Sequence, residues 1–296
     1  DGTANGLKFK LNQDIDFSTA GIPYIPYLGV TEFDGAGFEV NNFSWNEPTS
    51  NVGVFGTVKN SRVFNLTVNT VQYADQSSTT NAINGKDFVG SLIGSSDGSQ
   101  LYNVHAVMGG TVAGGAYVGG LAGSVRWAPV GNVTTVRASG VDVDVARVVG
   151  SGAYVGGVVG SMESVAVKTI SSDLDVAGGA SHAGGIAGNA TGNGAFNFAT
   201  TLGTAYVVDA TMQDVSSTAQ TVSGTGQYVG GLFGQAVIAA NAVNWSSTAS
   251  VTVTGNNGSV GGIAGQMSGS ALTNVHSTGA IVSQTNGNYI GGLFGR

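Results

Sequence analysis

The chain has 296 residues, of which 50 are glycine and only 9% are charged, against about one quarter charged in an ordinary soluble domain. Its four prolines, and the lack of glycine at every third position, exclude collagen, while a hydrophobic content of 42% excludes a disordered chain. The 10 basic residues against 17 acidic ones argue against nucleic-acid binding.

Residues 1–51 differ from the rest of the chain, since they hold three of the four prolines and the acidic segment 12–17. The chain starts in polar residues with no signal peptide, so we interpret it as a piece of a longer protein. We expect residues 1–51 to form one or two irregular coils that close the N-terminal end of a solenoid, because terminal repeats are atypical.

From residue 52 to residue 296 one glycine motif recurs eight times. Six copies read apolar residue-Gly-Gly, then two apolar residues and a closing glycine, as in Val118–Gly123. The closing glycines are Gly56, Gly94, Gly123, Gly160, Gly188, Gly234, Gly265 and Gly295. Recurrence at this spacing predicts a solenoid.

An asparagine follows most closing glycines at a fixed distance. It lies nine residues on in five repeats and ten residues on in one, whereas the fourth repeat has Thr169. The asparagines are Asn65, Asn103, Asn132, Asn197, Asn244 and Asn274. We predict that they stack into a structural ladder in which amides one coil apart bond to each other.

Alternating apolar and polar residues predict the strands of each repeat. The pattern is clear at 141–145, 174–176 and 251–253. We place one strand on the glycine motif, one after the asparagine and one on the alternating segment. Three strands in about 30 residues form one coil of a parallel β-helix, so we predict an all-β fold with about nine coils in one elongated domain. The paired glycines allow a bend that lets Val118 and Leu121 both face the core.

A second column precedes the glycine motif and is mostly aromatic. Its members are Phe88, Tyr117, Tyr154, His182, Tyr228 and Tyr289, with Ser259 as an interruption. We interpret the column as an aromatic stack that covers the sheet. The alternative is a stripe that binds sugars on its ring faces.

At these residues the chain resembles proteins that carry the GLUG motif. The resemblance rests on Leu11–Asp16, on Phe33–Phe38, on Val52–Gly56 and on the Gly-Gly repeats, and it covers nearly the whole chain. It implies a right-handed, single-stranded parallel β-helix in an extracellular surface protein. It implies no active site, because the motif is structural.

The residues that carry chemistry are few. The carboxylate pairs Asp14/Asp16, Asp142/Asp144 and Asp173/Asp175 have a spacing that suits an inverting glycosidase. We nevertheless interpret the pair Asp142/Asp144 as part of a solvent-facing side, since its valine neighbours should face the core. His105 and His276 share a phase but lie five repeats apart, so they do not form a zinc site. We therefore predict no catalytic residue, no metal and no cofactor.

The composition and the repeat together favour a non-enzymatic module of a cell-surface protein, an adhesin or its stalk, located outside the cell. One alternative is a filament or sheath subunit that stacks through open coil ends, and another is a polysaccharide-degrading enzyme. We predict a protruding ligand-contacting loop at 196–217, inside the longest repeat.

The predicted partners are a cell-surface glycan or protein, or a second copy of the chain. Self-association would use the coil ends or the surface of residues 215–296, where Arg296 is the single charged residue. We predict no nucleic-acid partner. No apolar run of 18 residues occurs, so we also predict no membrane span.

Overall fold

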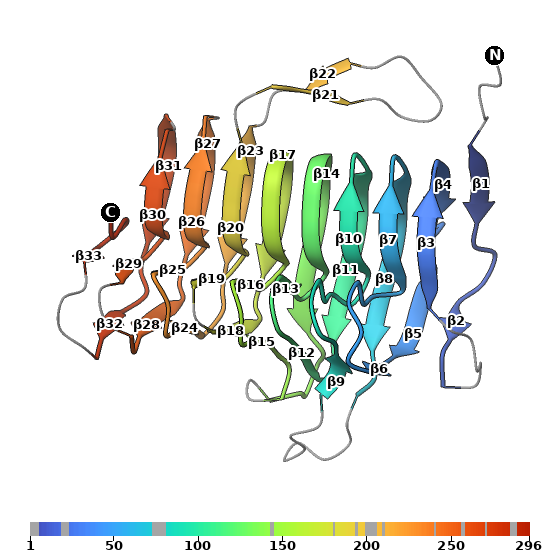
Figure 1. Cartoon of the computed structure of the whole chain (residues 1–296), viewed down its shortest axis with the longest axis horizontal. Coiled ribbons are helices and arrows are strands. Elements are labelled where there is room, and N and C mark those ends of the chain that lie inside the picture. The colour runs from blue at the N-terminus through green and yellow to red at the C-terminus, as the bar shows by residue number, and fades with distance from the viewer. Residues whose placement is uncertain are drawn as a thin grey trace.

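The chain forms an elongated stack of parallel strands, with β1 (Leu7–Lys10) at one end and β33 (Tyr289–Gly291) at the other (Figure 1). The computed structural model describes residues 6–18, 24–72, 81–142, 145–179, 181–192, 195–198, 206–208, 211–239, 241–255, 258–269, 271–284 and 289–296. Within these residues the strands form three parallel sheets, and one antiparallel hairpin stands apart. The predicted all-β parallel β-helix of about nine coils is confirmed.

The largest sheet has 17 strands in the described part of the chain. They are β1 (Leu7–Lys10), β2 (Ile15–Asp16), β3 (Ile25–Gly29), β4 (Thr31–Asp34), β5 (Glu39–Phe43), β7 (Phe55–Lys59), β8 (Arg62–Thr70), β10 (Ile93–Asp97), β11 (Gln100–Met108), β14 (Ala122–Arg137), β17 (Val159–Ser172), β20 (Ala187–Gly192), β23 (Met212–Ser217), β26 (Phe233–Ile238), β27 (Ala242–Ser247), β30 (Ala264–Ser268) and β31 (Leu272–Ser277). We call it the large sheet.

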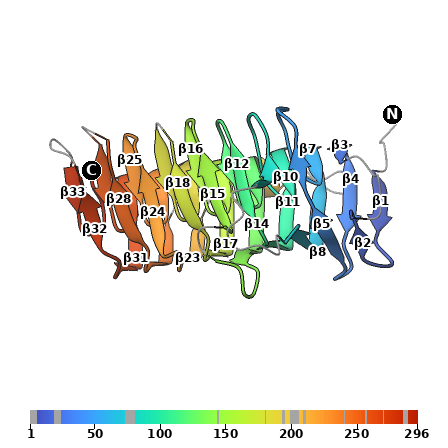
Figure 2. The ribbon, with the colours of Figure 1, turned by 90° about the horizontal axis from the view of Figure 1, so that it is seen from below.

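Two smaller parallel sheets close each coil, as the view from below makes visible (Figure 2). The first contains β6 (Trp45–Asn46), β9 (Asn81–Asn84), β12 (Thr111–Gly114), β15 (Arg147–Gly150), β18 (Asp175–Gly178), β24 (Thr221–Gly224), β28 (Ser250–Val253) and β32 (Ile281–Ser283). The second contains β13 (Val118–Gly119), β16 (Tyr154–Gly156), β19 (His182–Gly184), β25 (Tyr228–Gly230), β29 (Ser259–Gly261) and β33 (Tyr289–Gly291). The separate hairpin is β21 (Phe196–Phe198) with β22 (Tyr206–Val208).

The glycine motif forms a corner of the coil and does not lie inside one strand, which corrects the strand prediction. In one coil β16 ends at Gly156 and β17 begins at Val159, so the motif turns the chain from the small sheet into the large one. The turn buries both Val118 and Leu121 completely, as predicted.

The prediction of a strand over residues 141–145 is wrong for the residues that the structure describes there. The strand of that coil is β15, which starts at Arg147. Val145 instead lies in a turn whose backbone N–H bonds to the carbonyl of Asp142 at 3.1 Å. A local turn therefore forms here, although the short sequence pattern alternates between apolar and polar residues. The segment 251–253, by contrast, lies in β28 as predicted.

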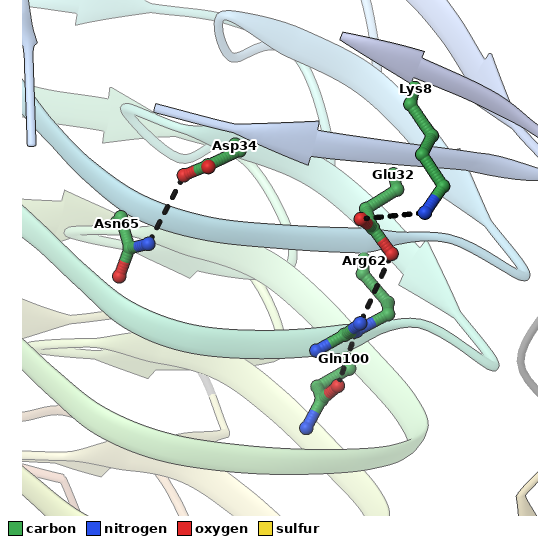
Figure 3. Close-up of polar contacts among 6 residues, drawn as sticks. All are labelled: Lys8, Glu32, Asp34, Arg62, Asn65 and Gln100. Carbon is green, nitrogen blue, oxygen red and sulfur yellow. Dashed lines mark hydrogen bonds and ion pairs between the residues drawn. The ribbon is translucent and has the colours of Figure 1, made fainter. Parts of the chain in front are cut away.

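The N-terminal coils continue the same stack. β1 pairs in register with β4, and β4 pairs with β8. Their outer face carries a chain of polar contacts in which Glu32 forms an ion pair with Lys8 at 3.6 Å and accepts a hydrogen bond from Arg62 at 3.1 Å (Figure 3). Arg62 also donates to Gln100 at 2.8 Å, so four successive coils are joined by side chains. No helix in the described residues is long and apolar enough to cross a membrane.

Candidate functional site

The asparagine ladder lies at a bend of the large sheet. Asn65, Asn103 and Asn132 have φ values of 51–53°, in the left-handed region that asparagine adopts more easily than other non-glycine residues. Each amide nitrogen donates to the side chain one coil before it, at 3.1, 3.0 and 2.6 Å, beginning with Asn65 on Asp34 (Figure 3). Asparagine therefore suits this position for two reasons: it adopts the positive φ of the bend, and its amide bonds to the neighbouring coil.

Asn197 is not a ladder residue, and this corrects the sequence prediction. It lies in β21 and pairs with Val207 of the hairpin. The ladder position of that coil is Asp214, which has φ +54° and accepts from Asn244 at 2.8 Å. Asn274 then donates to Asn244 at 2.9 Å. The hairpin is an insertion before the ladder position, so a count of nine residues from Gly188 stops inside it.

The ladder is interrupted at Thr169, and this break yields a prediction. Thr169 is exposed and has φ +64°, a strained backbone for a β-branched residue. Thr169→Asn should raise the free energy of unfolding by about 1 kcal/mol, because asparagine tolerates this φ and its amide reaches Asn132. Urea denaturation measures the change. Thr169→Ala is the control, and equal stability of the two variants would contradict the ladder explanation.

The aromatic column exists and its rings pack on each other. Phe88 and Tyr117 are stacked with centroids 4.5 Å apart and planes 11° apart. The contacts continue from Tyr117 to Tyr154, His182 and Tyr228 at 4.8–5.1 Å with tilted planes. Because neighbouring rings contact each other along the column, their faces cannot all stack on a sugar. The geometry thus supports the interpretation as a stack that covers the sheet.

A groove runs beside this column, across β7, β10, β14, β17 and β20, and has a volume of about 570 Å³. Its floor is a column of small polar side chains, one from each coil and in register. They are Thr57, Ser95, Ser124, Ser161 and Asn189. Its far edge is a second column of charged residues, which are Lys59, Asp97, Arg126 and Glu163.

The size of the floor side chains sets the extent of the groove. Thr57 and Ser95 are short and lie 3.4 Å apart, so they leave space above the strands. In the next coils beyond Asn189 the same column holds Gln235 and Gln266, which bond to each other at 2.6 Å. These longer amides lie outside the groove lining, so the groove ends near Asn189.

His182 continues the aromatic column between Tyr154 and Tyr228 and is neutral above strongly acidic pH. Burial lowers the pKa of its imidazole to about 4, against smaller opposing effects of hydrogen bonds that the ring makes to the Gln235 side chain and the Ala153 backbone. The hydroxyl of Ser181 bonds to its Nδ1. His182 therefore adds an aromatic ring to the column and no charge to the groove.

Three of the six carboxylates singled out in the sequence accept hydrogen bonds from backbone N–H groups of neighbouring coils. Asp14 accepts from the Glu39 N–H at 2.9 Å. Asp173 accepts from the Arg137 N–H at 2.8 Å, and Asp175 is buried and accepts from the two N–H groups of Gln220 and Thr221 at 2.8 and 3.0 Å.

Of the three remaining carboxylates of these pairs, the two that the structure describes are exposed. Asp16 accepts from Asn42 at 2.9 Å and from the Ser18 N–H, and these bonds lower its pKa. Asp142 is exposed, whereas Asp144 lies outside the described residues.

The two histidines with a common phase lie in separate coils. His105 contacts Thr134 at 2.7 Å and Asn103 at 3.2 Å, and burial lowers its pKa. His276 lies on β31, which is the ninth coil's strand and pairs with β27. Within the described residues no group of three or more histidine, aspartate or glutamate side chains could hold a metal ion.

The loop predicted at 196–217 is in part a hairpin. Its described strands β21 and β22 lie outside the stack (Figure 1). Its predicted end is wrong, because β23 returns to the large sheet and Ser217 is buried there.

Sequence reasoning missed the groove although one of its columns is visible in the sequence. In the first seven repeats the residue directly after the closing glycine is Thr, Ser, Asn or Gln, from Thr57 to Gln266. The column three residues on from that glycine contains the charged edge. Neither sequence pattern shows that the two columns border an open groove, because the open space depends on the geometry of the coils.

No protein-family model matches this sequence, and no curated protein matches it. Among solved structures the chain is similar to a Bacteroides ovatus protein described as a "putative immunoglobulin A1 protease". The match has a TM-score of 0.47 and 17% identity, and it covers 98% of this chain and 78% of that one. Similarity at this level supports no inference about what this chain does.

Proposed function

We propose that the chain is a non-enzymatic β-helical module of an extracellular surface protein, an adhesin of the GLUG-motif type or its stalk. The observation that carries the proposal is the continuous side-chain bonding between coils. The ladder from Asp34 to Asn132 and the chain from Lys8 to Gln100 each tie four coils together. Such bonding makes a stiff rod that presents its outer faces to a partner.

The position of the carboxylates supports a role without catalysis. A glycosidase needs one carboxyl group free to give a proton and one free to activate water. Asp173 and Asp175 instead accept bonds from backbone N–H groups of neighbouring coils. The enzyme alternative predicts turnover of a polysaccharide that Asp173→Asn abolishes, and such a result would contradict this proposal.

Adhesion is tested with the purified chain on beads. Beads that carry the chain should be retained on cell monolayers or on immobilised extracellular glycans more strongly than beads with serum albumin at the same density. Soluble chain should compete for the retention. Equal retention of both bead types on every surface would remove the adhesin role.

A filament subunit is the second candidate. Leu272 and Ile290 are 41% and 56% exposed, whereas Ala242 and Val260, their partners one coil earlier, are completely buried. A further coil or a second copy of the chain would cover them. Sedimentation velocity over a wide concentration range should show polymers if copies stack, and a monomer at all concentrations would contradict this candidate.

A further inference from the structure

We propose that the groove beside the aromatic column binds a neutral, linear polysaccharide that lies along the axis of the solenoid. The inference deepens the proposed adhesin function, and so rests on it, by naming the ligand class and the residues that hold it. The binding site is the floor column from Thr57 to Asn189, the charged edge from Lys59 to Glu163, and the tyrosines Tyr117 and Tyr154.

An unpartnered polar atom at the end of the groove points to a ligand. Asn189 is 8% exposed, and its Oδ1 is buried without a hydrogen-bond donor among the described residues. Its Nδ2 donates to Ser161 at 3.2 Å, which fixes the amide so that Oδ1 remains free to accept. A buried acceptor without a donor costs about 1–3 kcal/mol. Because Oδ1 lies below the groove surface, a ligand hydroxyl removes that cost once the Asn189 side chain turns toward the groove.

The floor repeats at a distance that suits a chain of sugars. Ser95, Ser124 and Ser161 pair in register on adjacent strands, so their hydroxyls recur at the coil spacing of about 4.8 Å. This spacing is close to the length of one pyranose unit. A serine hydroxyl both donates and accepts, as a sugar hydroxyl does. A linear glycan can therefore meet one floor hydroxyl with each successive unit.

The charges favour a neutral ligand. Lys59, Asp97, Arg126 and Glu163 alternate in sign along the edge, and Arg126 is bound to Asp97 at 3.0 Å. Two positive and two negative groups cancel, and His182 adds no charge. A polyanion such as an acidic polysaccharide or a nucleic acid gains no net attraction from this edge, because its two carboxylates offset its two cations.

The aromatic side supplies ring edges and hydroxyl groups. Tyr117 and Tyr154 line the groove, while their faces contact the neighbouring rings of the column. Burial, with smaller effects of Tyr154 and Asp87, raises the pKa of the Tyr117 hydroxyl. That hydroxyl therefore keeps its proton at neutral pH and can donate to a sugar oxygen.

An extended peptide fits this site less well. Peptides that add to sheets bind at a free strand edge through backbone bonds. The groove lies across the face of strands β10, β14 and β17, whose backbone groups already pair with each other. Only side chains are offered to the ligand here, and most of them are hydroxyls.

The test is calorimetric titration of the whole chain with linear hexasaccharides. The neutral probes are the hexamers of cellulose, mannan and galactan, and the charged probe is hexagalacturonate. We expect at least one neutral hexamer to bind and hexagalacturonate to bind at least tenfold more weakly. Ser124→Leu fills the centre of the floor and should abolish binding. Asn189→Ala removes one hydrogen bond and should weaken binding about fivefold.

The controls separate loss of the site from loss of the fold. Thr252 is the matched residue, because it faces outward from β28 on another sheet, and Thr252→Leu should bind as the original chain does. All variants should keep the original circular dichroism spectrum and urea midpoint. Gln266→Ala, in the floor column but beyond the groove, should also leave the affinity unchanged.

Three results would overturn the inference. They are no binding of any neutral hexamer, tighter binding of hexagalacturonate than of the neutral probes, and unchanged affinity in a folded Ser124→Leu variant. The bead assay distinguishes these from failure of the proposed function. If beads with Ser124→Leu adhere as well as the original, adhesion stands and the groove is not its site.

Discussion

Replacing Trp245 with alanine is expected to lower the free energy of unfolding by about 3–5 kcal/mol, the range for removing a fully buried large aromatic side chain. Trp245 is completely buried, and its ring packs on Phe233 with centroids 4.8 Å apart. Its indole N–H donates to the carbonyl of Met212 at 3.1 Å. The substitution opens a cavity between two coils and removes the indole hydrogen bond to that carbonyl.

Urea denaturation followed by circular dichroism measures the effect. Trp245→Phe should cost clearly less, because it keeps most of the ring volume and loses only the hydrogen bond and part of the contact. Trp127→Ala is the control, since Trp127 is 43% exposed, and a cost of no more than about 1 kcal/mol is expected. Equal costs at Trp245 and Trp127 would show that the core is not tightly packed at β27.

The register of the coils is predictable from the sequence because the bends need particular residues. The closing glycine is the second residue of β7, β14 and β17, and the asparagine at positive φ marks a bend further along the same coil, so their spacing is constant where the coil length is constant. Ladder members such as Asn103 and Asn132 therefore follow directly from counting.

The wrong prediction of a ladder position at Asn197 has a physical cause, and the sequence contains a pattern that identifies the correct position. An insertion at the corner after Gly192 moves the ladder position to Asp214, while counting assumes a coil of constant length. The segment after Asp214 reads Ser-Ser-Thr-Ala at 216–219, and the segment after Asn244 reads the same at 246–249. Alignment of these two segments places Asp214 and Asn244 in one column.

The groove is harder to predict because it is a space between side chains of five different coils. A serine after a glycine has no special meaning in one repeat. It forms part of a floor only when the neighbouring coils place equally short side chains at the same level, and when the aromatic column rises beside it. That condition depends on the packing of Ser124 between Ser95 and Ser161, which the register of the strands decides.

The second glycine of the motif is required for a different reason, and Gly231→Ala is expected to cost about 2–3 kcal/mol. A methyl group on Gly231 would collide with the carbonyl oxygen of Gly262 and with the side chain of Ser247, which is buried across the core. Gly292 occupies the same motif position two coils later and has no atom within 4 Å of an added Cβ. Gly292→Ala should therefore be nearly neutral and serves as the matched control.

The coil with β10 and β11 indicates how the collision is relieved. There Ser91 stands in the column of the second glycine, one coil before Gly120, and Ala106 stands in the hydroxyl column, one coil before Thr135. A larger residue on one side is thus matched by a smaller one on the other. The double variant Gly231→Ala with Ser247→Ala should recover about 1 kcal/mol relative to the sum of the single changes.

Urea midpoints of the two single variants, the double variant and the Gly292 control complete this cycle. Additive costs at Gly231 and Ser247 would mean that the carbonyl of Gly262, and not the serine, excludes the methyl group. Coupling of the expected sign would explain why the repeat keeps a glycine opposite each buried hydroxyl. It would also mean that the two positions can change only together, which is the constraint that holds the glycine motif in phase with the coil.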